Sequence, residues 1–201
     1  SQLGKTRFYN KQKPSPLDEA VSLIWYLENV FYHSASTIYN YLDKNIFESQ
    51  PIENSIFDFG FWPGGDRDGN PYVTPDITRK TAHALRFSIL RNYYRDLRKL
   101  KRKITFDGVD ETLSRLTDSL LEELFYPKQN PVITSDGLLS DLTKVHNILI
   151  QDHNGIYEAE VADMINKIKL FGFHFASLDI RQDSRVHNEV FNTLLTHKAA
   201  A

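Results

Sequence analysis

Two short strand-like segments, far apart in a chain that otherwise favours helices, restrict most strongly how this sequence can fold. Residues 55–62 read SIFDFGFW, an aromatic-rich run followed by Pro-Gly-Gly. Residues 172–184 read GFHFASLDIRQDS, in which two sets of side chains alternate as in a strand. Two strands cannot form a stable sheet alone, so they pair with each other or with strands outside this sequence. A helical connection of this length suits a crossover between parallel strands, as in a β/α barrel.

Helical periodicity accounts for most of the remaining chain. Ser15 is a plausible N-cap, Pro16 follows at the first helical position, and apolar residues then recur every three or four positions, which predicts a helix over about 16–44. A second long helix, capped by Thr74 or Asp76, is expected to run to about Lys103. Further helices are predicted over about 109–126, 136–151 and 156–171, and a final one from Ser184 or Arg185.

Composition excludes several classes of function. The chain has 201 residues, a net charge of −2 and no cysteine, which excludes disulfides, thiolate metal sites and cysteine nucleophiles. A net charge this close to zero creates no overall electrostatic attraction to nucleic acid. No apolar run approaches the roughly 18–20 residues of a membrane span. We therefore expect no nucleic-acid or membrane partner, and cysteine usage is compatible with an intracellular protein.

A basic run lies between Arg79 and Lys103, with ten Lys or Arg residues and Asp96 as the single acidic residue opposing them there. Tyr93 and Tyr94 are interleaved, so nucleic-acid binding through this run is one interpretation. Most of the charge falls in the last helical turns, where cations complement the helix dipole. A solvated helix end is the favoured interpretation.

The histidines and hydroxyl residues form no recognised catalytic motif. No histidine pair has HExxH spacing, and no serine or threonine stands in a nucleophile elbow. His83 and His174 lie among apolar residues and are predicted to be core histidines.

The first candidate site is the loop of residues 63–71, PGGDRDGNP. Its glycines permit positive φ and close approach to a ligand, and exposed N–H groups there can form an anion nest. Arg67 offers a planar fork of donors suited to phosphate or carboxylate. A tight surface turn whose aspartates cap their own backbone is an equally good interpretation. A calcium loop counted from Asp66 would need glycine and glutamate where Pro71 and Ile77 stand, and a P-loop ending is absent.

The second candidate site follows the second strand-like segment, in residues 178–184. If the strand ends near Ile180, Arg181 leaves at its carboxyl end, where barrel chemistry is found. Held by Asp179 or Asp183, Arg181 would be a fixed anion receptor. From residue types alone, a structural ion pair with a helix cap at Ser184 is the favoured alternative.

These two segments resemble conserved motifs of the phosphoenolpyruvate carboxylase family. Residues 59–79, FGFWPGGDRDGNPYVTPDITR, are similar to the family pattern FxSWMGGDRDGNPxVTxxxTR, and residues 178–187, LDIRQDSRVH, to LDIRQESxRH. Residues 14–20, PSPLDEA, resemble PTPxDEA, and the likeness runs from about residue 5 to 192. The departures from these patterns are Phe61, Pro63, Asp183 and Val186.

The resemblance implies a fold and a reaction. Family members are large, mainly helical enzymes built on an eight-stranded β/α barrel, so this chain is expected to be mainly α, with parallel barrel strands near 57–62 and 175–181. Residues 1–198 would be one fragment of the barrel domain. The three alanines at 199–201 are interpreted, from the residues themselves, as a vector-derived tail. The implied reaction carboxylates phosphoenolpyruvate with bicarbonate, giving oxaloacetate and phosphate with Mg²⁺ or Mn²⁺. The full-length enzyme so implied has an anaplerotic role, is cytoplasmic and forms a homo-oligomer.

The resemblance also assigns residues. Arg181 would contact the phosphate side of phosphoenolpyruvate, the loop would line the same mouth, and Trp62 would lie close to the substrate pocket. The substrate-binding set so implied is Trp62, Gly64, Gly65, Asp66, Arg67, Asp68, Gly69, Asn70 and Arg181, with Arg181 as the catalytic residue. The family's catalytic histidine, in a TAHPT motif, and its metal-binding carboxylates are absent from this sequence. The chain alone, with the remainder of the polypeptide missing, is therefore expected to be inactive; the alternative is a non-catalytic helical binding or scaffold module.

Overall fold

The computed structural model describes residues 13–46, 57–126 and 133–199. Its helices are α1 (Pro16–Tyr26), α2 (Tyr32–Asn45), α3 (Pro75–Lys103), α4 (Asp110–Phe125), α5 (Ser135–Asp152), α6 (Glu158–Phe171) and α7 (Ser184–Ala199), with a π-helical turn, η2 (Leu27–Phe31), joining α1 to α2. From α3 onward each helix lies within two residues of the predicted bounds. The expectation of a mainly α chain is confirmed.

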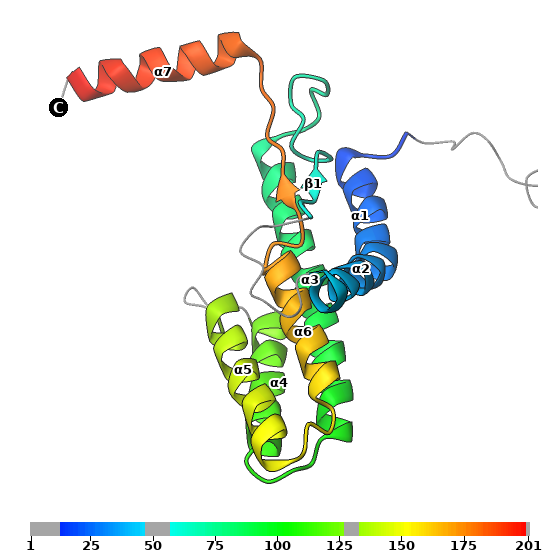
Figure 1. Ribbon diagram of the computed structural model, residues 1–201. Helices are drawn as coiled ribbons and strands as arrows, with labels where there is room; N and C mark the ends of the chain where they lie inside the picture. The colour runs from blue at the N-terminus through cyan, green and yellow to red at the C-terminus, as the bar shows by residue number, and fades with distance from the viewer. Residues whose placement is uncertain (1–12, 47–56, 127–132, 200–201) are drawn as a thin grey trace, which may run out of the picture.

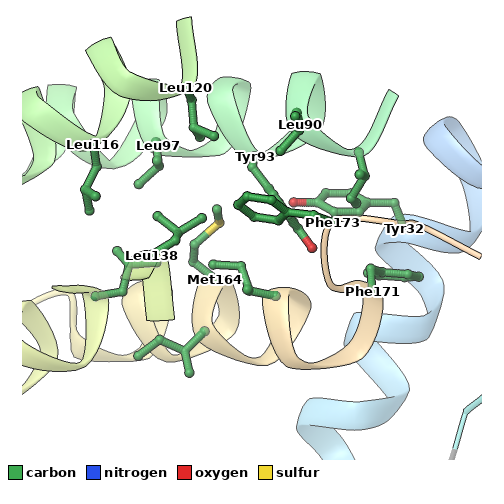
Figure 2. Packing of buried hydrophobic residues seen from close by; sticks show 14 of the residues in the cluster. Tyr32, Leu90, Tyr93, Leu97, Leu116, Leu120, Leu138, Met164, Phe171 and Phe173 are labelled. Atoms are coloured by element: carbon green, nitrogen blue, oxygen red, sulfur yellow. The ribbon is translucent and has the colours of Figure 1, made fainter. Parts of the chain in front are cut away.

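Helices α3 to α6 pack side by side as the body of the molecule (Figure 1). Figure 2 shows Leu97 of α3, Leu116 of α4 and Leu138 of α5 projecting toward one another, with Met164 of α6 between them. All four side chains are buried. The apolar stripes that predict these helices therefore meet in one continuous core.

The first long helix is continuous but not uniformly α-helical. Its start is fixed by a capping box, in which the Ser15 hydroxyl accepts from the Asp18 N–H and the Asp18 carboxylate accepts from the Ser15 N–H. The π-helical turn η2 then inserts a wider turn and shifts the inward face. As a result Phe31, which follows the three- or four-residue apolar spacing of the predicted helix, is 46% exposed, and the neighbouring Tyr32 is buried in its place.

Acidic residues from other helices meet the basic run of α3. The buried Glu28 carboxylate, in η2, accepts from Arg91 and, at 2.8 Å, from Arg95. Arg86 pairs with Glu123 of α4 at 2.7 Å. Part of the basic run is thus neutralised by carboxylates of other helices. The remaining part includes the exposed lysines and arginines at the end of α3.

The prediction that His83 and His174 are core histidines is wrong for this chain. Both side chains are exposed. They lie on faces of α3 and of the segment before β2 that no described element covers, while their apolar neighbours Leu85 and Phe175 turn inward.

The two strand-like segments form a parallel pair, β1 (Gly60–Phe61) and β2 (Ser177–Leu178). Gly60 is in register with Ser177, and Phe61 with Leu178. The prediction of parallel pairing with each other is confirmed, although the strands are shorter than the expected ranges 57–62 and 175–181. A turn interrupts β1, because the Gly65 and Asp66 N–H groups donate back to the Trp62 carbonyl. Residues 55–56 of the first predicted segment lie outside the described residues.

Helix α7 extends away from the body after β2 (Figure 1), and the side chains described along it are exposed. None of the described helices, α7 included, has the length and apolar character needed to cross a membrane.

Candidate functional site

The turn after β1 and the segment after β2 are joined by their backbones. The Arg67 N–H donates to the Arg181 carbonyl at 3.0 Å, and the Arg181 N–H donates to the Gly65 carbonyl at 3.0 Å. These bonds form a parallel bridge between Asp66 and Arg181, beyond the carboxyl ends of both strands. Two motifs distant in sequence therefore meet at one edge of the strand pair, as predicted.

Two glycines allow this close approach. Gly64 has φ +78°, and a Cβ there would lie 2.2 Å from the Thr81 hydroxyl oxygen of α3. A Cβ on Gly65 would lie 2.0 Å from the Asp179 carbonyl oxygen. The loop is therefore held between α3 and the end of β2, and its glycines are required for packing whether or not a ligand binds.

Arg67 is tied back to the start of α3. Its Nη2 donates to the Thr78 hydroxyl at 3.2 Å, and that hydroxyl donates to the Gly64 carbonyl at 2.7 Å. The Arg67 Nε is buried without a partner among the described residues. One edge of the guanidinium is thus fixed by the scaffold.

Two aspartates flank Arg67 and affect each other. The pKa of Asp66 is raised mainly by a hydrogen bond between its carboxyl group and that of Asp68, because such a bond needs a proton on one of the two groups. Desolvation of Asp66 raises its pKa further. The positive charge of Arg181 opposes this shift. The acidic side chains of the turn therefore lie within the electrostatic reach of the arginine contributed by the other motif.

Arg181 is exposed, and its guanidinium has no hydrogen bond or ion pair within the described part of the chain. The prediction that Asp179 or Asp183 holds it is wrong here. Asp183 instead accepts from Arg185, whose Nε donates at 3.1 Å and whose Nη2 donates at 2.7 Å, and this pairing lowers the pKa of Asp183. Asp183 also accepts from the Arg185 N–H, so it, and not Ser184, caps the start of α7.

The other predicted site residues lie around the same loop. Trp62, directly after β1, is 52% exposed. Asp68 and Gly69 are exposed, and the Asn70 side chain accepts from the Tyr72 N–H at 3.0 Å. The structure thus brings all nine predicted residues to one end of the molecule, and the Asn70 bond is the self-capping expected of a tight turn.

Comparison with known proteins identifies the family. A sequence model described as phosphoenolpyruvate carboxylase matches residues 1–125 and 107–200. The chain belongs to the phosphoenolpyruvate carboxylase family. The resemblance inferred from the two motifs is confirmed.

Curated phosphoenolpyruvate carboxylases match almost all of this chain but only part of themselves. The Aeromonas hydrophila protein is 26% identical over 224 residues, covering 96% of this chain and 26% of that protein. The Vibrio atlanticus protein is 25% identical, covering 92% and 24%. The Rhodopseudomonas palustris protein is 24% identical, covering 96% and 26%. The chain spans about a quarter of the length of these relatives.

Sequence reasoning gave no role to Thr78, although this residue belongs to the matched phosphoenolpyruvate carboxylase motif. The sequence did offer one signal for Thr78. It lies one helical turn after Thr74, the N-cap of α3, and therefore on the side of the helix that faces the preceding loop. Its contact with Arg67 could not be read from spacing.

The divalent metal implied for phosphoenolpyruvate carboxylase does not fit the residues described here. Within ranges 13–46, 57–126 and 133–199, no group of three or more His, Asp or Glu side chains is placed to hold a metal ion. Any such metal would need ligands from outside these residues.

Proposed function

We propose that this chain forms part of the substrate-binding end of a phosphoenolpyruvate carboxylase, which converts phosphoenolpyruvate and bicarbonate to oxaloacetate and phosphate. The observation that carries this proposal is the parallel bridge between Asp66 and Arg181. It brings two groups to one edge of the strands: an arginine that forms no ion pair with the residues the structure describes, and a glycine-rich turn with a second arginine. A substrate and intermediates that are all anions need such an arrangement.

Arg181 is the group best suited to receive the phosphate side of the substrate. Its guanidinium is exposed and makes no ion pair with a carboxylate among the described residues, so an incoming anion does not have to displace one of these carboxylates. A guanidinium can bind a phosphate or carboxylate through two parallel hydrogen bonds. Arg67 adds positive charge from the other motif, and Asp66 and Asp68 lie on either side of it in the turn.

The loop and Trp62 would form the wall of the same site. Gly64 and Gly65 let the loop pack closely against α3 and the end of β2, which fixes the position of the backbone on that side of the site. Trp62 offers an exposed aromatic surface at the end of β1. The resulting pocket would have one charged side, one aromatic side and a backbone floor.

The proposed whole enzyme is a β/α barrel in which β1 and β2 are successive strands. The remainder of the polypeptide would supply the other strands, the catalytic histidine and the carboxylates for Mg²⁺ or Mn²⁺. This chain alone would therefore not turn over substrate. The parent enzyme would be a cytoplasmic homo-oligomer.

The test is an assay of the full-length protein for oxaloacetate, measured with phosphoenolpyruvate, bicarbonate and Mg²⁺. Arg181→Ala should lower kcat/KM at least about 100-fold, because a charge-assisted contact to the reacting phosphate is lost. Arg185→Ala is the matched control, since this exposed arginine pairs with Asp183 and with no other acidic residue in the described ranges, and it should retain near-normal activity.

An inactive full-length protein would instead support the non-catalytic scaffold alternative. Near-normal activity of Arg181→Ala would remove Arg181 from the site. Turnover by the 201-residue chain alone would overturn its proposed inactivity.

A further inference from the structure

We infer that Thr78 is a positioning residue that sets the orientation of Arg67 and the path of the loop with one hydroxyl group. The inference rests on the proposed function for the identity of the substrate. The geometry on which it depends is independent of that function.

The Thr78 hydroxyl has the right number of partners. It carries one proton, which goes to the Gly64 carbonyl at 2.7 Å; the Thr74 carbonyl, at 3.2 Å, is the longer alternative. Its oxygen accepts from Arg67 Nη2 at 3.2 Å. Thr78 is 8% exposed, so water cannot readily replace either bond.

The hydroxyl is itself held rigidly. The Thr78 N–H donates to the Thr74 carbonyl at 3.0 Å in the first turn of α3, and Thr74 caps that helix. A group on a packed helix transmits a fixed position better than a group on a loop. Thr78 is therefore a fixed reference point against which the loop is placed.

The start of the loop is closely packed next to this reference point. Gly64 has α3 close on one side, where Thr81 leaves no room for a Cβ, and Gly65 has Asp179 close on the other. The carbonyl of Gly65 then accepts from the Arg181 N–H. A hydrogen bond to Gly64 from Thr78 consequently constrains the backbone that contacts Arg181 as well as the side chain of Arg67.

Thr81 provides a matched control on the same helix. It lies one turn further along, is 0% exposed, and its hydroxyl has no hydrogen-bond partner among the described residues. Replacing threonine by valine keeps the shape and removes the hydroxyl at both positions. The two variants therefore differ mainly in the hydrogen bonds that they remove.

The experiment uses full-length protein with Thr78→Val, Thr78→Ser and Thr81→Val. Thr78→Val should lower kcat/KM for phosphoenolpyruvate about tenfold or more, mainly through a higher KM, because a charge-assisted and a neutral hydrogen bond are lost. Thr78→Ser should recover activity to within about threefold of the starting protein, and Thr81→Val should stay within about twofold.

A double-mutant cycle tests whether Thr78 acts through Arg67. In an Arg67→Lys background, Thr78→Val should cost less than about threefold, because the contact to the guanidinium has already been disrupted. A loss equal to that in the parent protein would contradict the inference, as would equal effects of Thr78→Val and Thr81→Val.

Amide hydrogen exchange over residues 63–71 gives a readout that does not need activity. Thr78→Val should accelerate exchange in this loop and Thr81→Val should not. If the starting protein makes no oxaloacetate, the proposed function fails while this measurement still tests Thr78. Unchanged exchange in Thr78→Val would overturn the positioning role.

Discussion

The helical body, α3 to α6, and the strand end, formed by β1, β2, the 63–71 loop and α7, are built on different principles. In the body, apolar residues from the helices bury one another, and charged residues find partners on neighbouring helices. At the strand end, the two strands are only two residues long. They are followed by an exposed tryptophan, an exposed arginine and a helix with little contact to the rest. Most apolar side chains of the body are thus covered by other described residues, whereas several large side chains of the strand end are exposed.

Lys167 shows how the body accommodates a buried charge. Its ammonium group contacts Asp163 at 2.7 Å and Asp96 at 3.0 Å, and lies 4.9 Å from the centre of the Tyr32 ring. Burial alone would lower the pKa of Lys167, but hydrogen bonds and charge from Asp163 and Asp96 raise it overall. A buried charge is tolerated here because it is paired on more than one side.

Helix α7 shows the opposite case. Its large apolar side chains fall on one half of the helix and are exposed: Val186, Val190, Phe191, Leu194 and Leu195. Such an amphipathic stripe normally packs on a core. Its exposure marks the strand end as the part whose packing is least complete in this chain.

The largest expected effect is in the body. Leu120→Ala removes a side chain that is 0% exposed, and should lower the free energy of unfolding by about 3 kcal/mol. Chemical denaturation of the 201-residue chain, followed by circular dichroism, measures this loss. A change below about 1 kcal/mol would show that the body is not the stable unit.

The next effect concerns the paired charges. Lys167→Met should cost about 2 kcal/mol at neutral pH, because Asp96 and Asp163 lose their shared cation. Burial raises the pKa of Asp96, but Lys167 and Lys99 outweigh it and leave the pKa lowered, so this stabilisation is present above the ordinary value of 3.8 and is lost as the pH falls through the lower folded-state pKa.

The difference in unfolding free energy between Lys167→Met and the starting protein should therefore begin to shrink as the pH falls below about 3.8, and should be lost below the lowered folded-state pKa of Asp96. Denaturation curves at several pH values measure it. A difference that stays constant into acid would show that Lys167 contributes through packing alone.

A smaller global effect is expected at the strand end. Gly65→Ala places a Cβ against the Asp179 carbonyl and should separate the loop from β2, yet lower the stability of the body by only about 1 kcal/mol. Hydrogen exchange should rise in residues 63–71 and 177–181 and remain unchanged in α3 to α6. Equal acceleration throughout would mean that the two regions unfold together.

The smallest effect is expected in α7. Leu194 is 64% exposed, so Leu194→Ala should change the unfolding free energy by less than about 0.5 kcal/mol. The same leucine-to-alanine change at Leu120 is its direct counterpart. A loss similar to that of Leu120→Ala would show that α7 packs against the body in solution.

The helices could be predicted because their signals are local. Ser15 and Thr74 cap the helices that follow them, and the apolar stripes of α4 and α5 set their extent. The π-helical turn could not be predicted in this way, since Glu28 is held there by Ser88 and Arg91 from a helix distant in sequence. Tertiary contacts, not spacing, also decide that His83 and His174 remain outside the core.

For the candidate site, the sequence predicted which segments meet but not which side chains contact one another. The motifs indicated that Arg67 and Arg181 meet, since parallel strands present their carboxyl ends at one edge. The motifs did not indicate that Asp183 pairs with Arg185, or that Thr78 fixes Arg67. The Asp183 carboxylate and the Thr78 hydroxyl each had several possible partners at similar distances along the sequence.

The central claim is that the two motifs pair in parallel register beyond the strands. Scalar couplings across hydrogen bonds, measured by nuclear magnetic resonance on the 201-residue chain, test it directly. We predict a coupling from the Arg67 amide nitrogen to the Arg181 carbonyl carbon, and one from the Arg181 amide nitrogen to the Gly65 carbonyl carbon. Absence of both couplings, with contacts between the two segments that fit an antiparallel register, would contradict the account.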